Sequence, residues 1–160
     1  MTSKHISIIT VCVTMLAGCS SHRTVPAAEP DHPVVITSQN LDQIHGMPWT
    51  LKAMIIHGNE YPLSEQRPFI TFENNGRLSG FASVNRIFGA LQIDHNGAVK
   101  WTTPLGSTKM AGPPESMNQE STFLSILKQT KTLTLKDMSL HTQTPNPETK
   151  LVFVGSVKTD

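Results

Sequence analysis

The alternation of apolar and polar residues predicts β-strands over most of the chain beyond residue 46. Residues 47–56 (MPWTLKAMII) alternate with a period of two, and their apolar side carries Trp49, Leu51, Ala53 and Ile55. Two β-prone runs flank Asn75-Gly76, and two more flank His95-Asn96-Gly97. Because asparagine and glycine tolerate positive φ, each of these two sites predicts a hairpin.

One segment, residues 113–131, has a helical period. Its apolar stripe consists of Met117, Phe123, Leu124 and Leu127, with Ile126 at the edge. Such a stripe is more typical of a core than of a binding surface. A second, short helix through Leu41 and Ile44 is predicted upstream, capped by Thr37 or Ser38 and ended by Gly46.

Three short strands are predicted after the long helix, at residues 132–137, 139–143 and 151–155, where they would form an antiparallel meander. The order is therefore strands, one main helix, and strands again, which indicates an α+β domain. A chain of this length forms one domain that buries roughly two-thirds of its unfolded surface. We expect this domain to be monomeric and to span residues 41–157.

The N-terminus carries a different pattern, an apolar run at residues 6–16 that follows Lys4. The run is shorter than the roughly 20 residues of a membrane-spanning helix, but it fits a signal peptide. Leu16-Ala17-Gly18-Cys19 resembles the lipobox of bacterial lipoprotein signal peptidase. The resemblance implies cleavage after residue 18 and lipidation of Cys19, with acylation (including palmitate) as the membrane anchor; the alternative is an ordinary cleaved signal that ends near a cysteine.

The lipobox interpretation predicts where the protein is and how it is attached. Ser20 is not the aspartate associated with inner-membrane retention, so the expected location is the periplasmic face of the outer membrane. Residues 19–40 contain Pro26, Pro30 and Pro33 in a polar setting and predict a flexible tether. Cys12 lies in the signal peptide, which leaves no pair of thiols for a disulfide in the mature domain.

The net charge and the possible metal-binding and catalytic residues exclude several classes of function. The chain has 13 basic and 12 acidic residues, and removal of residues 1–18 takes away only Lys4, which leaves 12 of each. This balance argues against nucleic-acid binding. The histidines lack metal-ligand spacing, so neither a metal site nor a cofactor is expected. Ser107-Thr108-Lys109 could place a nucleophile beside a base, but without an acid partner a structural loop is the better interpretation.

Several motifs from about residue 41 to residue 155 together resemble one family. They are Trp49-Thr50-Leu51, RPFITFENNGRLSGF at 67–81, Asn85-Arg86 with Gly89, STKMA at 107–111, and Met117, Glu120 and Phe123-Leu124. In this order and spacing the sequence resembles a META domain of the HslJ type, found in bacterial envelope lipoproteins that include heat-shock-associated members. The resemblance implies a curved, partly barrel-like antiparallel sheet packed on one main helix.

The chain departs from that family at two positions. Many META domains carry one cysteine just before the Asn-Arg pair and another after the STKMA segment, where this chain has Val84 and Gly112. If that pair forms a bridge in relatives, its joint absence removes redox chemistry here. Val84 is then expected to pack in the core.

The same resemblance singles out Asn85, Arg86 and Glu120 as polar residues in fixed motifs. One hypothesis is a ligand or partner site. The alternative is structural: Asn85 satisfies backbone groups in a tight bend, and Arg86 pairs with a helix carboxylate.

Two classes of function remain from the sequence. The first is a non-enzymatic envelope lipoprotein that binds a partner protein or maintains the envelope under stress. The second is a pilotin-like carrier that holds an acyl chain or hydrophobic peptide in an apolar cavity lined by residues such as Phe81, Phe88 and Leu124. A cavity of roughly 300 Å³ or more would favour the carrier. No catalytic residue is predicted.

Overall fold

The computed structural model describes residues 32–156, so the predicted signal peptide, Cys19 and most of the predicted tether lie outside the described residues. The described strands are β1 (Val34–Val35), β2 (Pro48–Ile56), β3 (Asn59–Glu60), β4 (Phe69–Phe72), β5 (Arg77–Phe81), β6 (Arg86–Ile93), β7 (Val99–Ser107), β8 (Thr132–Lys136), β9 (Ser139–Gln143) and β10 (Lys150–Gly155). A 3₁₀ helix, η1 (Leu41–Ile44), precedes β2, and α1 (Pro114–Lys128) separates β7 from β8.

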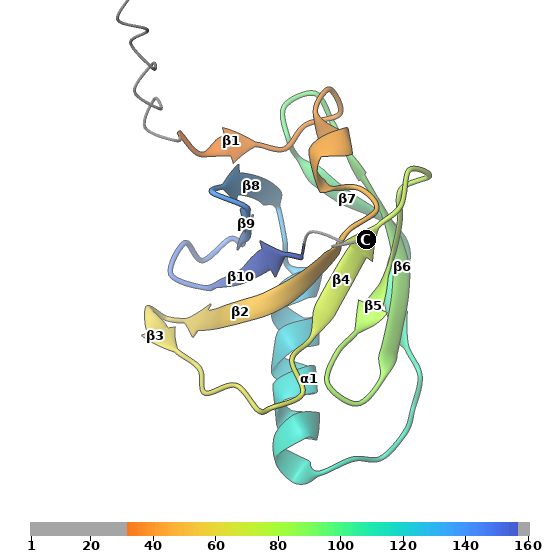
Figure 1. The fold of residues 1–160 in the computed structure, drawn as a ribbon, viewed down its shortest axis with the longest axis vertical. Coiled ribbons are helices and arrows are strands. Elements are labelled where there is room, and N and C mark those ends of the chain that lie inside the picture. Colours follow the sequence, from red (N-terminus) through yellow and green to blue (C-terminus); the bar gives the residue numbers. More distant parts are fainter. Residues whose placement is uncertain (1–31, 157–160) are drawn as a thin grey trace, which may run out of the picture.

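The strands form one antiparallel sheet in the order β1-β8-β9-β10-β2-β4-β5-β6-β7, with β3 paired to β2. Figure 1 shows this sheet curling, with α1 behind β2. The two ends of the sheet approach one another without closing: the Val99 amide of β7 donates to the Lys131 carbonyl before β8 at 2.8 Å. The predicted α+β fold with a curved sheet on one main helix is confirmed.

Both predicted hairpins are present and connect β4 to β5 and β6 to β7. Gly76 has φ +78° and Gly97 has φ +85°, the left-handed conformation that glycine adopts without strain. Gly76 is also constrained by space, because a Cβ there would lie 2.8 Å from the Leu91 carbonyl oxygen. The meander of β8, β9 and β10 also matches the prediction.

The inward series along β2 differs from strict alternation. Trp49, Leu51 and Met54 are buried, whereas Ala53 and Ile55 are only partly buried. Val152 of β10 pairs with Ala53 and Phe153 with Leu51, so Lys52 is an extra residue in the ladder. This β-bulge reverses the alternation after Leu51, which a pattern of period two cannot anticipate.

The folded region begins earlier than the predicted boundary at residue 41. Val34 and Val35 pair with Leu135 and Thr134 of β8, and the next residue, Ile36, is completely buried. The Ile36 amide also donates to the Leu133 carbonyl at 2.8 Å. This β-branched run covers the edge of β8 that would otherwise expose unpaired backbone groups. Residues 34–40 therefore belong to the domain and not to a tether.

The short helix η1 lies where it was predicted, but the predicted N-cap residue is wrong. The residue before its first turn is Asn40, not Thr37 or Ser38, and Asn40 makes no side-chain cap. Its Oδ1 instead accepts the backbone amide of Thr37 at 2.7 Å, which closes the turn before η1. Gly46 follows η1 with φ +74°, as predicted.

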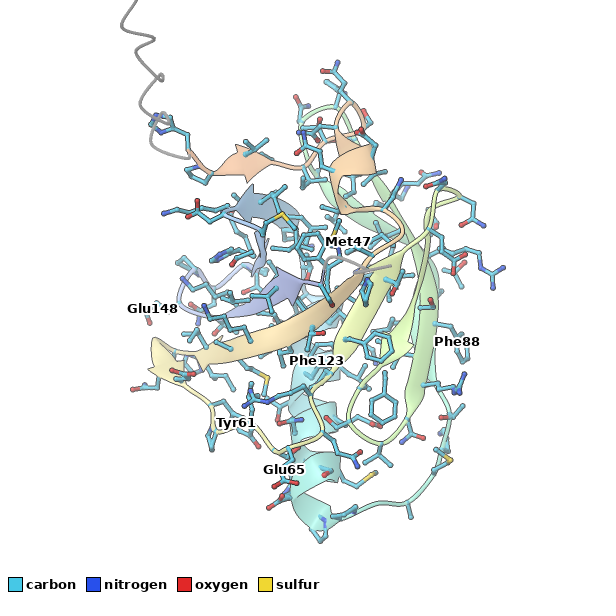
Figure 2. The ribbon with its side chains drawn as sticks, in the orientation of Figure 1. Met47, Tyr61, Glu65, Phe88, Phe123 and Glu148 are labelled. Atoms are coloured by element: carbon cyan, nitrogen blue, oxygen red, sulfur yellow. The ribbon has the colours of Figure 1, made fainter. Side chains whose placement is uncertain are left out.

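The core lies between the concave side of the sheet and α1. Trp49, Phe123 and Phe153 are each 0% exposed, and Figure 2 shows Phe123 in the middle of the molecule. The rings of Phe123 and Phe153 meet edge to face, with 6.2 Å between their centroids. The Trp49 indole Nε1 donates to the Ile44 carbonyl at 2.9 Å, so its one polar atom is satisfied.

Candidate functional site

The N-terminal half of α1 buries polar side chains where an amphipathic helix ordinarily buries apolar ones. Ser116, Gln119 and Glu120 are between 1% and 6% exposed. Their spacing of three and four residues places them on the side of the helix that Phe123 continues. The predicted stripe is therefore wrong in its first half, because Met117 is only partly buried there.

Glu120 holds the connection between β5 and β6. Its Oε2 accepts hydrogen bonds from the backbone amides of Val84 at 3.1 Å and Asn85 at 2.8 Å. Its Oε1 accepts from Asn85 Nδ2 at 2.8 Å. Three N–H groups thus surround a buried carboxylate, and hydrogen bonds to an ionised group are the strong ones. Glu120 fixes the bend at 82–85 with both of its oxygens.

Asn85 joins this bend to the segment between β7 and α1. Its Oδ1 accepts from the Met110 amide at 2.7 Å and from Thr108 Oγ1 at 2.8 Å. Its Nδ2 donates to the Met110 carbonyl at 3.2 Å as well as to Glu120. Both acceptor positions and both donor hydrogens of the amide are therefore used within the domain. This arrangement matches the structural alternative for Asn85.

Gln119 holds a second connection, the one between β3 and β4, although it was not among the predicted site residues. Its Oε1 accepts from the Ser64 amide at 2.7 Å, and its Nε2 donates to the Gln66 carbonyl at 3.0 Å and to Ser83 Oγ. Ser83 has φ +108°, a strained value for a residue with a side chain. A polar residue that interrupts the buried stripe of α1 is the signal that could have identified Gln119.

Arg86 does not join this polar cluster through its side chain. Its backbone pairs with Thr108, whose Oγ1 accepts from the Arg86 amide at 3.1 Å. The Glu120 carboxylate is taken by Val84 and Asn85, so the predicted pairing of Arg86 with a helix carboxylate is not found. The Arg86 side chain is exposed on the other side of the sheet.

Val84 and Gly112 are in contact. A Cβ on Gly112 would lie 3.4 Å from Val84 Cβ and 2.7 and 2.9 Å from its two methyl groups. The backbone of Gly112 lies outside the left-handed region, so its conformation does not require glycine. This contact is compatible with a bridge at these positions in relatives that carry the two cysteines, but Val84 is only partly buried and is not the core residue that was expected.

The outer side of β4, β5 and β6 presents an aromatic surface. Phe69 and Phe81 are opposite each other on β4 and β5 and stack with 6.4 Å between centroids. Arg86 is opposite Phe81, and Phe88 is two residues further along the same side of β6. Phe69 is 37% and Phe88 54% exposed, and Figure 2 shows Phe88 at the periphery of the molecule. These four residues form the surface that we call the aromatic face.

The other candidate sites carry little chemistry within residues 32–156. No group of three or more His, Cys, Asp or Glu side chains in that region is arranged to hold a metal ion. Thr108 of the Ser-Thr-Lys motif donates its hydroxyl to Asn85, which fits a structural loop. Among the described helices, none is both long and apolar enough to cross a membrane.

The fold and the buried polar cluster define a small α+β domain. In it, polar side chains of one helix hydrogen-bond the loops of a curled sheet. A family model for the META domain matches residues 42–157, and the chain belongs to that family. No curated protein matches the chain.

Solved structures share this fold at low sequence identity. An NMR structure of a protein from Burkholderia xenovorans is 19% identical with a TM-score of 0.64, covering 83% of this chain and 97% of that one. A crystal structure of a DUF4847 family protein from Bacteroides vulgatus is 15% identical with a TM-score of 0.54, covering 74% and 98%. At such identities the likeness shows the fold alone.

Proposed function

We propose that this protein is an outer-membrane lipoprotein, anchored through Cys19, whose META domain binds an envelope protein in the periplasm and catalyses no reaction. The lipobox-like sequence before Cys19 supports the anchor. Binding to a partner of this kind would serve envelope maintenance under stress.

The observation that carries partner binding is the aromatic face. Aromatic residues and arginine are the side chains most enriched among interface residues that contribute strongly to affinity. Here three phenylalanines and Arg86 project from adjacent strands of a rigid sheet. The Phe88 ring is preorganised because it lies against Gly106, where a Cβ would come within 2.7 Å of the ring. Such a surface binds without first ordering a loop.

The polar cluster supports a role other than catalysis. A catalytic acid or base needs a polar atom that reaches a substrate. Glu120 and Asn85 instead direct their polar atoms to backbone and side-chain groups of the domain itself. We therefore assign these two residues to the architecture that presents the surface.

The carrier hypothesis is less well supported. Phe81 and Phe88 lie on the outer side of the sheet, whereas Leu124 belongs to α1 and packs against the core on the inner side. These three residues therefore do not line a common cavity. The space that an acyl chain would need between sheet and helix is occupied by core residues such as Phe123 and Phe153.

Site-specific photocrosslinking in intact cells tests the proposal. A photoreactive amino acid at position 88 should capture a discrete envelope protein, and the same group at Met138, another exposed apolar residue, should not. Substitution of Arg86 by alanine should reduce the capture at position 88, while the domain keeps its thermal midpoint. Equal capture at positions 88 and 138, or none at either, would contradict the aromatic face as a binding surface.

Fractionation tests the anchor separately. The Cys19→Ser variant should remain unlipidated and leave the outer-membrane fraction, because the acyl chains supply the membrane affinity. Acyl modification is followed by mass spectrometry of the N-terminal peptide. Recovery of Cys19→Ser protein in the outer membrane at the wild-type level, with the same mobility, would rule out the lipid anchor.

A further inference from the structure

The outer side of β8, β9 and β10 carries a depression of about 320 Å³ whose lining includes Thr134, Lys136, His141 and Lys150. Thr134 and His141 are opposite each other on β8 and β9. Lys136 is two residues beyond Thr134 on the same strand, and Lys150 begins β10. Side chains from three strands therefore converge on one place, which we call the basic depression.

The charge around the basic depression is positive. Burial is the main cause that lowers the pKa of His141. The positive charges of Lys150, Lys136 and Lys52 lower it further. The described lining contains no carboxylate. Figure 2 shows Glu148 at the outer margin of the molecule, and this residue does not line the depression.

One polar atom of the basic depression has no partner. Thr134 is only 9% exposed, and its Oγ1 is buried without a hydrogen bond. A buried hydroxyl left unpaired is costly, since most buried polar groups in proteins are satisfied. An unpaired donor beside two lysines is the arrangement expected for a site that gains a partner on binding an anion.

We propose that the basic depression binds a phosphate-type oxyanion. Two ammonium groups from different strands, the Thr134 hydroxyl and the His141 ring supply donors from several directions, which suits a tetrahedral anion with several oxygens. A bound phosphate offsets the repulsion among the lysines and gives the Thr134 hydroxyl an acceptor. The aromatic face lies on other strands, so this site is separate from the partner surface.

The phosphate can belong to a lipid headgroup or to a soluble compound. The basic depression is bordered by Pro33, just before β1, where the chain from Cys19 enters the domain. If Cys19 carries the anchor, this part of the domain is the one tethered nearest to the headgroups. That argument for a lipid source rests on the proposed function, whereas binding of phosphate itself does not.

The first experiment titrates the purified mature protein with inorganic phosphate at pH 7 and constant ionic strength, with chloride as the comparison anion. We expect a saturable shift of the His141 ring signals in NMR spectra and a higher pKa of His141 with phosphate bound. Lys136→Gln with Lys150→Gln should weaken binding at least about tenfold, the loss of charge-assisted hydrogen bonds. The control removes two exposed lysines elsewhere, Lys100 and Lys109, and should bind like wild type.

Substitution of Thr134 by valine tests whether the Thr134 hydroxyl serves phosphate binding or the stability of the fold. This variant keeps the shape of the side chain but lacks the hydroxyl, so phosphate should bind several-fold more weakly while the thermal midpoint stays equal or rises. A fall in midpoint with unchanged binding would show that the hydroxyl serves the fold. The absence of a saturable His141 shift with phosphate, or equal binding by the Lys136/Lys150 and Lys100/Lys109 variants, would overturn the site.

Vesicles distinguish the two sources. The unlipidated Cys19→Ser protein is mixed with phosphatidylcholine vesicles that contain or lack phosphatidylglycerol. Cosedimentation that requires phosphatidylglycerol and is lost in the Lys136/Lys150 variant would assign the site to lipid headgroups. Phosphate binding without cosedimentation would assign it to soluble phosphate compounds. Neither result depends on Cys19 or on the aromatic face, so this site and the proposed function can fail independently.

Discussion

The N-terminal half of α1 buries Ser116, Gln119 and Glu120, whereas its C-terminal half buries Phe123, Ile126 and Leu127. Both halves turn the same side toward the domain, but they meet different surroundings. The apolar half meets the regular strands of the sheet, whose backbone groups are already paired. The polar half meets the connections at 62–67 and 82–85. There the Ser64, Val84 and Asn85 amides and the Gln66 carbonyl take helix side chains as hydrogen-bond partners.

The difference shows that burial and hydrophobicity are separate properties of a helix face. Phe123 contributes through removal of apolar surface from water and close packing. Glu120 contributes by accepting from the Val84 amide and from the buried Asn85 amide, which would otherwise lack this acceptor. Truncation of Phe123 leaves a cavity, whereas loss of the Glu120 carboxylate leaves unpaired backbone donors. The two halves should therefore respond differently to substitution.

The largest effect is expected in the apolar half. Phe123→Ala should lower the free energy of unfolding by about 3–5 kcal/mol, because a fully buried ring leaves a cavity against Phe153. Urea denaturation followed by tryptophan fluorescence measures the loss. Leu124→Ala is the matched control, and since Leu124 is only partly buried its cost should be clearly smaller. Equal costs would mean that the apolar side of the helix is misplaced.

A smaller loss is expected in the polar half, at nearly constant volume. Glu120→Gln should cost about 2–3 kcal/mol, since an amide nitrogen replaces one of the two accepting oxygens. Urea denaturation is again the measurement, and Glu115→Gln, at an exposed position in the first turn, is the control.

Asn85→Asp probes the same cluster from the opposite side. It puts an oxygen where Nδ2 now donates to Glu120 and Met110, so it should be about as harmful as Glu120→Gln. A wild-type denaturation midpoint for both variants would argue that water, and not this cluster, satisfies the bend.

The contact between Val84 and Gly112 offers a gain in stability beside the polar half. A Val84→Cys, Gly112→Cys variant exported to the periplasm should form a disulfide, because the 3.4 Å Cβ separation is near the range of natural bridges. The chain-entropy model gives about 2–3 kcal/mol after an allowance for strain. Mass spectrometry detects the bridge, and reduction should abolish the gain.

Single substitutions at this contact provide the control for the disulfide. Gly112→Ala alone should cost about 1–2 kcal/mol, because its new methyl meets the Val84 methyls at 2.7 and 2.9 Å. Adding Val84→Ala should restore most of that loss. Two free thiols in the exported cysteine variant would refute the geometry.

The smallest effect should come from His141, away from both halves of α1. Burial and the neighbouring lysines lower its pKa in the folded state, so below about pH 6.5 the unfolded chain takes up the proton first. Stability should therefore decline as the pH falls from 6.5 toward the lowered folded pKa. His141→Gln should flatten this part of the profile, measured as the urea midpoint at each pH. Parallel profiles for variant and wild type would assign the decline to other groups.

Local rules in the sequence determined much of the fold. Asn75-Gly76 and Gly97 place two hairpins because a positive φ is a property of the residues themselves. The periodicity of residues 113–131 predicted α1, and the alternation after it predicted β8, β9 and β10. The motifs around Trp49, Asn85 and Glu120 were sufficient to predict the META family, which the family model confirms. The hairpins, the helix and the strands could be predicted because their conformations depend on residues close together in the chain. The family could be predicted because several motifs occur in one order and spacing.

Tertiary structure alone decided the details of the candidate sites. The bulge at Lys52 exists only because β10 pairs with β2, and it moved Met54 instead of Ala53 into the core. Glu120 accepts from Asn85, which is 35 residues away in the chain. Arg86 joins Phe81 in the aromatic face, and Thr134 is opposite His141, through strand pairings that sequence patterns did not specify. A buried polar residue takes its role from its partner, and the partner is known only once the chain has folded.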